Sequence, residues 1–300
     1  MISRRGALAA AAVGLLPQPL RSEGLVPLRV ACLDWSGAEA LLSLGVAPAG
    51  VIDPAGYART MVEPALPADV VDLGAGWAPN IEMLQRIAPD LILIPPWPGR
   101  FGPIERIAPA EVLPARTDGR DTIDTARHVL SALARRVGAP IPAAAVGAAF
   151  DATIARARLS LGADRSRPVY HVFLSPDGRE VAVSTPGGLV DDVLVRLGLA
   201  NAWRGGPSSW GVARAGIEEL AGNSEALIVH ADEGTLTRVT LERLSRNRIW
   251  RHLPAVRAGR VYAIPPIYRF GGLATGARLA RLLAAGLPVA TGGVGVPQRA

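Results

Sequence analysis

Aromatic side chains in the loops that follow predicted strands are the residues of this chain best suited to hold a ligand. Aromatic residues make up only 5% of the 300 residues. Those that fall in such loops are Trp77, Trp97, Phe101, Trp203, Trp210, Tyr268 and Phe270. Ligands of open parallel sheets bind beyond the carboxyl ends of the strands, and a bound ligand covers rings that are costly to expose. Arg59, Arg100 and Arg269 stand in similar loops and offer hydrogen-bond donors to ligand oxygens.

Patterns that would carry catalysis or bind a metal are missing from the sequence. The four histidines show no HxxH, HExxH or histidine–cysteine spacing, and the one cysteine, Cys32, lies in an apolar strand pattern. There is no GxSxG nucleophile elbow and no phosphate-binding P-loop. The pair Gly74 and Gly76 lacks the third glycine of a dinucleotide fingerprint. We therefore expect no metal held by protein ligands, and a nucleotide-dependent or glycosyl-transfer enzyme is the least favoured interpretation.

The positive charge of the chain does not indicate a nucleic-acid partner. The net charge is +6, and all 32 basic residues are arginines because the sequence contains no lysine. These arginines are scattered, with no basic run and no aromatic residues interleaved among them. The sequence therefore predicts no nucleic-acid binding.

The first residues have the pattern of an export signal. Arg4 and Arg5 precede a short apolar run at residues 7–16, which is too short to span a membrane. An arginine pair before such a run is typical of the twin-arginine export route. We expect residues 1–23 to be this signal and the mature protein to lie in the periplasm.

Two pairs of similar segments indicate that the chain contains two related halves. PNIEMLQRIAPDLILI at residues 79–94 resembles AGIEELAGNSEALIV at residues 215–229, and each predicts an amphipathic helix followed by an aliphatic strand. AEALLSLGV at residues 38–46 likewise resembles VDDVLVRLGL at residues 190–199. Continuous aliphatic strands that alternate with helices predict parallel sheet buried on both faces. We expect two Rossmann-like α/β lobes facing a cleft, where a small molecule would bind.

A helical stretch separates the two predicted lobes. Asp121 is placed to cap one helix, and Pro142 to open a second helix of about 20 residues, or ~30 Å. This second helix is long enough to join the lobes directly. The predicted division is an N-terminal lobe at residues 27–120, the helical stretch at 121–163, a C-terminal lobe at 164–290 and a tail at 291–300.

A series of segments, in order along the chain, carries a resemblance to a known family. They are LDWSGAEALLSLGVAPAGVID (residues 33–53), EPALP (63–67), VDLGAGWAPNIEML (71–84), RIAPDLILI (86–94), LANAW (199–203), SWG (209–211) and LPAVRAGRVYAIP (253–265). With them the chain resembles the periplasmic substrate-binding proteins of iron–siderophore ABC importers, most closely the type that binds hydroxamate siderophores such as ferrichrome. The resemblance covers nearly the whole chain.

The resemblance implies two α/β lobes joined by one long helix, with the ligand in a shallow cleft that closes little. It implies a monomer that captures a ferric siderophore, with the hydroxamate type favoured, and delivers it to an ABC permease dimer in the inner membrane. Because a siderophore already fills the coordination sphere of its iron, no further cofactor is implied. Delivery of haem or a cobalamin is the alternative within the same class of transporter.

The resemblance also implies roles for individual residues. Trp203 and Trp210 match aromatic residues that line the siderophore pocket. Tyr268 and Phe270 match the aromatic cluster of the second lobe, and Arg269 replaces an aromatic residue there.

The chain departs from the family pattern at other ligand positions. Gly76 stands where the family has a ligand-binding arginine, and Thr60 stands where it has a pocket tryptophan. Trp97 is nearest to a pocket tyrosine of the family. Arg59 or Arg100 would then supply the missing donor.

Two acidic residues are candidates for contact with the permease. In the family, one acid on each lobe typically pairs with an arginine of the permease. Glu105 follows the predicted strand at residues 91–94, and Glu233 follows the equivalent strand at 226–230. The internal repeat therefore assigns them to matching positions on the two lobes.

Overall fold

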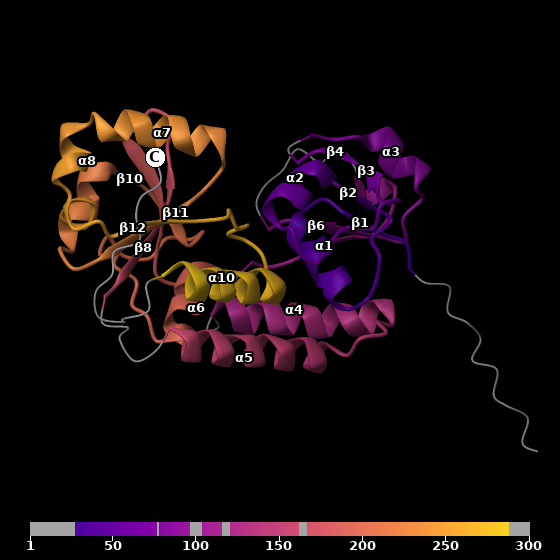
Figure 1. Ribbon diagram of the computed structural model, residues 1–300. Coiled ribbons are helices and arrows are strands. Elements are labelled where there is room, and N and C mark those ends of the chain that lie inside the picture. Colours follow the sequence, from indigo (N-terminus) through magenta and orange to yellow (C-terminus); the bar gives the residue numbers. More distant parts are fainter. Residues whose placement is uncertain (1–27, 77, 97–103, 116–120, 162–166, 288–300) are drawn as a thin grey trace, which may run out of the picture.

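Two α/β lobes on a layer of helices make up the described part of the chain. The computed structural model describes residues 28–76, 78–96, 104–115, 121–161 and 167–287. The N-terminal lobe, in indigo and purple, and the C-terminal lobe, in red and orange, stand side by side above the helices (Figure 1). The predicted fold class of two α/β lobes connected through helices is confirmed.

The main sheet of the N-terminal lobe is entirely parallel, with the order β3–β2–β1–β6–β7. Its strands are β1 (Val30–Cys32), β2 (Gly50–Val51), β3 (Val71–Asp72), β6 (Leu91–Ile94) and β7 (Ala110–Val112). A two-stranded ribbon of β4 (Gly74–Ala75) and β5 (Ala78–Pro79) follows β3. The helices of this lobe are α1 (Trp35–Ser43), α2 (Pro54–Thr60), α3 (Ile81–Arg86) and the short 3₁₀ helix η1 (Ile104–Arg106).

Both faces of this sheet are buried, as its continuous aliphatic strands predict. Along β1, Val30 and Cys32 join the core on the side of the helical layer, while Ala31 and Leu33 join a second core on the opposite face. All four side chains are fully buried. The thiol of Cys32 is therefore a core group, as predicted, and burial raises its pKa well above the usual range.

The sheet of the C-terminal lobe is mixed, so the prediction of parallel sheet holds for three of its strands and is wrong for the other two. Its order is β10–β9–β8–β11–β12. β8 (Val169–Leu174), β11 (Leu227–Ala231) and β12 (Val261–Ile264) are parallel. β9 (Glu180–Ser184) pairs antiparallel with β8, and β10 (Val212–Gly216) pairs antiparallel with β9. The chain reverses between β8 and β9 in a tight turn, where Gly178 has a φ of 65°.

The internal repeat is confirmed in the topology of the two sheets. β6 lies between β1 and β7, and β11 lies at the equivalent position between β8 and β12. A short helix precedes each strand: α3 in the first lobe and the 3₁₀ helix η2 (Ile217–Gly222) in the second. Asn80 caps α3 as predicted, since its side chain accepts a hydrogen bond from the amide of Met83 at 3.0 Å. The segments at residues 79–94 and 215–229 thus form equivalent parts of two related lobes, whereas the segments at 38–46 and 190–199 do not: the first lies in α1 after β1, and the second in α6 after the antiparallel strand β9.

A layer of packed helices lies beneath both lobes (Figure 1). It contains α4 (Thr122–Val137), α5 (Ala143–Ser160), α6 (Leu189–Leu197) and α10 (Leu273–Gly286). The remaining helices, α7 (Thr235–Ser245), α8 (Arg248–His252) and α9 (Pro254–Arg257), belong to the C-terminal lobe.

α5 joins the lobes as predicted, and the structure shows that α4 spans the same distance in the opposite direction. At the start of α4, which Asp121 caps as predicted, the amide of Thr122 donates to Asp192 of α6 at 2.6 Å. Beyond its end, the amide of Ile141 donates to the carbonyl of Leu44 in the N-terminal lobe at 3.1 Å. α5 then returns to the C-terminal lobe. The connection is therefore a pair of antiparallel helices.

One apolar core continues from lobe to lobe through this layer. Within the described residues, Val30 of the N-terminal sheet, Phe150 of α5, Leu279 of α10 and Val229 of the C-terminal sheet all belong to it. Separate cores cover the outer face of each sheet. The lobes therefore share a core, which fixes their relative position more firmly than a linker would.

Candidate ligand-binding cleft

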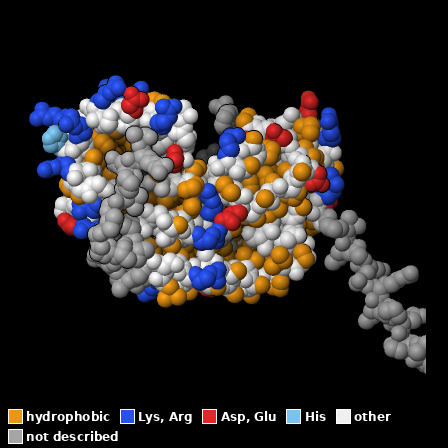
Figure 2. Space-filling model, viewed as in Figure 1, with side chains coloured by type: hydrophobic (Ala, Val, Ile, Leu, Met, Phe, Trp, Pro, Cys, Tyr) orange, Lys and Arg blue, Asp and Glu red, His pale blue; other side chains and the backbone are white. Residues whose placement is uncertain are grey.

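A cavity of about 260 Å³ lies between the two lobes. The N-terminal lobe and the start of α4 contribute Pro96, Val112, Pro114, Ala115 and Thr122 to its wall. The C-terminal lobe contributes Gly187, Gly188, Leu189, Ser209, Trp210 and Gly211, and the chain between β12 and α10 contributes Arg269, Phe270 and Gly271. Above the helical layer a notch in the surface separates the lobes (Figure 2). The space that these residues line is hereafter the inter-lobe cavity.

Aromatic rings form a continuous row from the N-terminal lobe to this cavity. Tyr57 meets Trp35 with ring centroids 6.3 Å apart, and Trp35 meets Tyr268 at 5.1 Å. Tyr268 meets Phe270 at 5.6 Å, and Phe270 meets Trp210 at 6.2 Å, both edge to face. These separations are typical of favourable aromatic pairs. The row therefore couples both lobes, and its last two rings line the inter-lobe cavity.

Residues 268–272, hereafter the linking segment, are the last part of the connection from β12 to α10. Two buried carboxylates of the N-terminal lobe hold this segment by hydrogen bonds. The hydroxyl of Tyr268 donates to Oδ2 of Asp34 at 2.7 Å. The carboxylate of Glu39 in α1 accepts hydrogen bonds from the amide of Gly272 and from an amide in the first turn of α10, each at 2.8 Å. Glu39 thus satisfies amides at the start of α10 that would otherwise lack partners.

Burial sets the proton affinities of this cluster. It raises the pKa of Asp34 and of Glu39, while the hydrogen-bond donors that surround each carboxylate act in the opposite direction. Burial, and then the charge of Asp34, raise the pKa of Tyr268 beyond its usual range. Tyr268 therefore stays protonated and keeps donating to Asp34.

The loop that carries Trp210 is positioned by a close approach of two glycines. A Cβ added to Gly188 would lie 2.7 Å from the Cα of Gly211, so these positions leave no room for side chains. Gly211 also has a φ of 67°, which favours glycine. The amide of Thr185 donates to the carbonyl of Gly211 at 2.9 Å. This contact leaves Trp210 at the cavity with 46% of its surface exposed.

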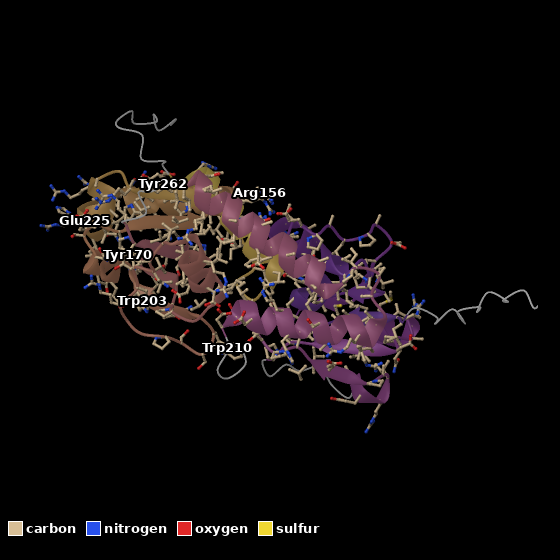
Figure 3. All side chains as sticks on the ribbon, turned by 90° about the horizontal axis from the view of Figure 1, so that it is seen from below. Arg156, Tyr170, Trp203, Trp210, Glu225 and Tyr262 are labelled. Atoms are coloured by element: carbon tan, nitrogen blue, oxygen red, sulfur yellow. The ribbon has the colours of Figure 1, made fainter. Side chains whose placement is uncertain are left out.

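The structure brings some of the predicted ligand residues together and leaves others apart. Trp210, Arg269 and Phe270 line the inter-lobe cavity, and Tyr268 lies directly beside Phe270. Trp203 packs against the core of the C-terminal lobe and does not line this cavity. Figure 3, which labels both tryptophans, shows Trp210 displaced from Trp203 towards the N-terminal lobe.

The other predicted ligand residues do not line the cavity or cannot be placed. Arg59 is exposed on α2, which corrects the prediction that it lies in a loop. Trp77, Trp97, Phe101 and Arg100 lie outside the described residues, so their roles stay predictions.

The two acids predicted to contact the permease are both exposed. Glu105 lies in η1, after β6, and Glu233 lies after β11. β6 and β11 are equivalent strands, so each acid comes after the same strand of its own sheet, Glu105 further along the chain than Glu233. Their docking role stays a prediction.

Sequence reasoning missed the residues that hold the cavity wall in place. Asp34 precedes α1 in a pattern typical of an N-cap, but nothing local identifies its partner, which is 234 residues away. Glu39 lies within a predicted helix, where the sequence alone predicts a solvent-exposed acid, but the structure leaves only 1% of it exposed. The glycine pairs at residues 187–188 and 205–206 mark turns without showing what packs on them.

The described ranges contain no cluster of three or more His, Cys, Asp or Glu side chains that could hold a metal ion. In those same ranges we find no helix with the length and apolarity needed to cross a membrane.

Comparison with known proteins identifies the family. The sequence profile of the periplasmic binding protein family matches residues 30–268, which is most of the chain. The chain belongs to this family. Over 290 residues, this periplasmic binding protein is 28% identical to the iron(3+)-hydroxamate-binding protein FhuD of Escherichia coli K12, covering 94% of this chain and 96% of the relative. It is also 24% identical over 242 residues to the Fe(3+)-citrate-binding protein YfmC of Bacillus subtilis, covering 79% of this chain and 72% of the relative.

Solved structures agree with this assignment. FhuD from Vibrio cholerae, bound to Fe3+–Desferal, superimposes with a TM-score of 0.76 at 25% identity, covering 86% of this chain and 97% of that one. The petrobactin-binding protein YclQ of Bacillus subtilis has a TM-score of 0.67 at 16% identity, covering 86% and 91% of the two chains, and shows the shared fold alone. The resemblance found in the sequence is therefore confirmed.

Proposed function

We propose that this protein captures a ferric siderophore, with the hydroxamate type favoured, and delivers it to an ABC permease in the inner membrane. The observation that carries the proposal is the inter-lobe cavity, walled by Trp210 and Phe270 and edged by Arg269. The proposal is also supported by the 28% identity of this chain to an iron(3+)-hydroxamate-binding protein over nearly the full length of both chains. The family is one of binding proteins rather than enzymes.

The chemistry of the cavity wall suits a ligand whose iron is already coordinated. Among the described residues that line it, none is His, Cys, Asp or Glu, so these residues offer no strong ligand to a bare ferric ion. The aromatic rings instead cover apolar parts of a chelate, and the arginine donates to its oxygens. The volume of about 260 Å³ is slightly below the ~300–1,000 Å³ of ordinary small-molecule pockets. A ferric chelate would therefore remain partly exposed.

The export route is part of the same proposal. Residues 1–23, with Arg4 and Arg5, would direct the chain through the twin-arginine pathway. Replacing both arginines by lysine should leave the protein in the cytoplasmic fraction of cells that export the wild type. Equal amounts of wild type and variant in the periplasm would contradict this route.

Ligand titration tests the function directly. Ferric hydroxamates, ferric catecholates, haem and a cobalamin are each added to the purified protein while its tryptophan fluorescence is followed. We expect ferric hydroxamates to quench the fluorescence and to saturate a site of one ligand per chain, because Trp210 lies on the cavity wall. Saturation by haem or cobalamin alone would replace the siderophore with that ligand. No saturable response to any of them would overturn the proposal.

A further inference from the structure

Arg269 places a cation on the wall of the inter-lobe cavity. It stands in the linking segment between Tyr268 and Phe270, two rings of the aromatic row. Its guanidinium carbon lies 4.5 Å from the ring centroid of Phe173 in β8. A cation–π contact of this kind orients the guanidinium and covers one of its faces. The N–H donors lie in the plane of the group, so they stay available to a ligand at its edge.

The charge of Arg269 lacks an ion-pair partner among the described residues. The side chain is half-buried, yet no described carboxylate lies within ion-pair distance and no described acceptor takes a hydrogen bond from it. Glu233 attracts it only through a longer-range Coulomb interaction. Burial is the largest influence on this group and lowers its pKa, as expected for a cation that has lost water without gaining a partner.

The other described residues of the cavity wall are uncharged. Apart from Arg269, the described lining residues are Pro, Val, Ala, Thr, Gly, Leu, Ser, Trp and Phe. In such surroundings an anionic group of a ligand gains Coulomb attraction and charge-assisted hydrogen bonds from the guanidinium. A cationic group at the same place would be repelled by the guanidinium, and none of the described lining residues is an acid that could compensate.

We propose that Arg269 receives an anionic oxygen of the ligand, so that the cleft prefers a ferric chelate with a carboxylate arm to one with an ammonium arm. This inference rests on the proposed function, because it adds a charge preference to the ferric chelate proposed for the same cavity. Arg269 is the specificity-determining residue, and Phe173 is a positioning residue behind it.

Three linear trihydroxamates with the same iron-binding core test the preference. Ferrioxamine B ends in an ammonium group, its N-acetyl derivative is neutral, and its N-succinyl derivative ends in a carboxylate. The dissociation constant of each chelate from the purified protein is measured by tryptophan fluorescence. We expect the carboxylate form to bind about tenfold to a hundredfold more tightly than the ammonium form, the range of a hydrogen bond to a charged group. Added salt should reduce the ratio.

Variants assign the preference to one side chain. Arg269→Gln should abolish the ratio of affinities, Arg269→Glu should reverse it, and Arg269→Lys should keep part of it because the charge remains. Phe173→Leu should reduce the ratio, since the guanidinium loses the ring that orients it. The matched control is Arg257→Gln, which removes an exposed arginine of α9 and should leave the ratio unchanged. Circular dichroism checks the fold of each variant.

The outcomes separate this inference from the proposed function. Equal affinity of the wild type for the carboxylate and ammonium forms would overturn the inference, and this measurement needs no variant to fold. A preference that survives Arg269→Gln would overturn it as well. Either result leaves siderophore binding itself intact. If the wild type binds none of the three trihydroxamates, nor any other ferric chelate, the proposed function fails, and the inference fails with it.

Discussion

Replacing Trp210 by alanine should weaken ligand binding and leave the fold stable. Trp210 lines the inter-lobe cavity and is 46% exposed. Since a tryptophan buries up to about 250 Å², roughly 115 Å² is left for a ligand to cover. At about 25 cal/mol per Å², this area corresponds to about 3 kcal/mol if it is fully covered and about 1.5 kcal/mol if half covered. The dissociation constant should therefore rise by about tenfold to a hundredfold.

Trp203→Ala is the matched control, because the two tryptophans lie in the same loop between α6 and β10. Trp203 packs against the buried core of the C-terminal lobe, and a Cβ added to Gly205 would lie only 2.3 Å from its ring. Its removal leaves a gap in this packing. We expect a loss of about 2–4 kcal/mol in the free energy of unfolding, at or below the range for large aromatic residues replaced by alanine, with little change in ligand affinity.

Two measurements on each variant separate these effects. Ligand titration followed by absorbance or calorimetry gives the dissociation constant without relying on the tryptophan that was removed, and urea unfolding followed by circular dichroism gives the stability. Wild-type affinity in Trp210→Ala, with the fold intact, would show that the ligand does not bind against this wall. Weakened binding in Trp203→Ala with unchanged stability would place Trp203, and not Trp210, at the ligand.

Further changes test a buried histidine, a helix cap and the permease contact. Burial lowers the pKa of His171 from 6.5 to about 4, so its contribution to stability is present above pH 6.5 and lost as the pH falls towards 4. The imidazole of His171 forms a hydrogen bond with the hydroxyl of Ser184 at 2.9 Å. The wild type should lose about 2–3 kcal/mol of its free energy of unfolding through His171 between pH 7 and pH 4.5, and the double variant His171→Phe with Ser184→Ala should not show this part of the loss in urea unfolding. Glu39→Ala removes the carboxylate that caps α10 and should lower the free energy of unfolding by about 1–2 kcal/mol in the same assay. Glu105→Arg with Glu233→Arg should abolish siderophore uptake by cells and leave the affinity for a neutral chelate unchanged, since both acids are exposed and neither lines the cavity.

The histidine variant and the permease-contact variant each have a control on the same molecule. His128 is exposed on α4. His128→Gln should therefore keep the pH dependence of stability that the His171→Phe, Ser184→Ala double variant loses. If the double variant of the buried pair keeps the same dependence as the wild type, His171 does not cause it. Glu82→Arg with Glu242→Arg reverses two exposed acids elsewhere on the lobes and should leave uptake intact. Uptake at the wild-type rate in the Glu105 and Glu233 variant would show that other acids carry the contact.

The sheets were predictable because the sequences of their central strands are compatible with few structures other than buried strands. β6 reads Leu-Ile-Leu-Ile, and β11 begins Leu-Ile-Val. Such runs are stable only where both faces are covered, which is the position of a central parallel strand. The polar residues that open the helices were equally informative, since Asn80 and Asp121 satisfy amides that have no partner inside the helix. Strands and caps of this kind depend on local chemistry.

The edge of the second sheet depends on tertiary pairing and was not predictable in the same way. β10 reads Val-Ala-Arg-Ala-Gly, which has neither a continuous apolar run nor a strong strand propensity. It is a strand because β9 offers a free edge, and residues from Val212 to Gly216 pair with it in register. The orientation of the two tryptophans in the preceding loop is a similar case. Their spacing does not show which ring turns to the core and which to the cavity.

The burial of the two carboxylates is the part of the site that the sequence predicts least. Asp34 and Glu39 are charged residue types that ordinarily face water, and the groups that satisfy them lie in the linking segment and in α10, at the other end of the chain. Their burial is possible only because several donors converge on each carboxylate after the lobes have come together. No local pattern contains that information.

The linking segment explains how the inter-lobe cavity keeps its shape. It leaves β12 of the C-terminal lobe, yet Asp34 and Glu39 of the N-terminal lobe hold it. Moving the lobes apart would break these hydrogen bonds and open the apolar core that the lobes share through the helical layer. The aromatic wall and the lobes are therefore fixed relative to one another, and binding energy need not be spent on ordering them. Under the proposed function, a ligand held without closure would keep one side exposed, and that side would be available to a permease.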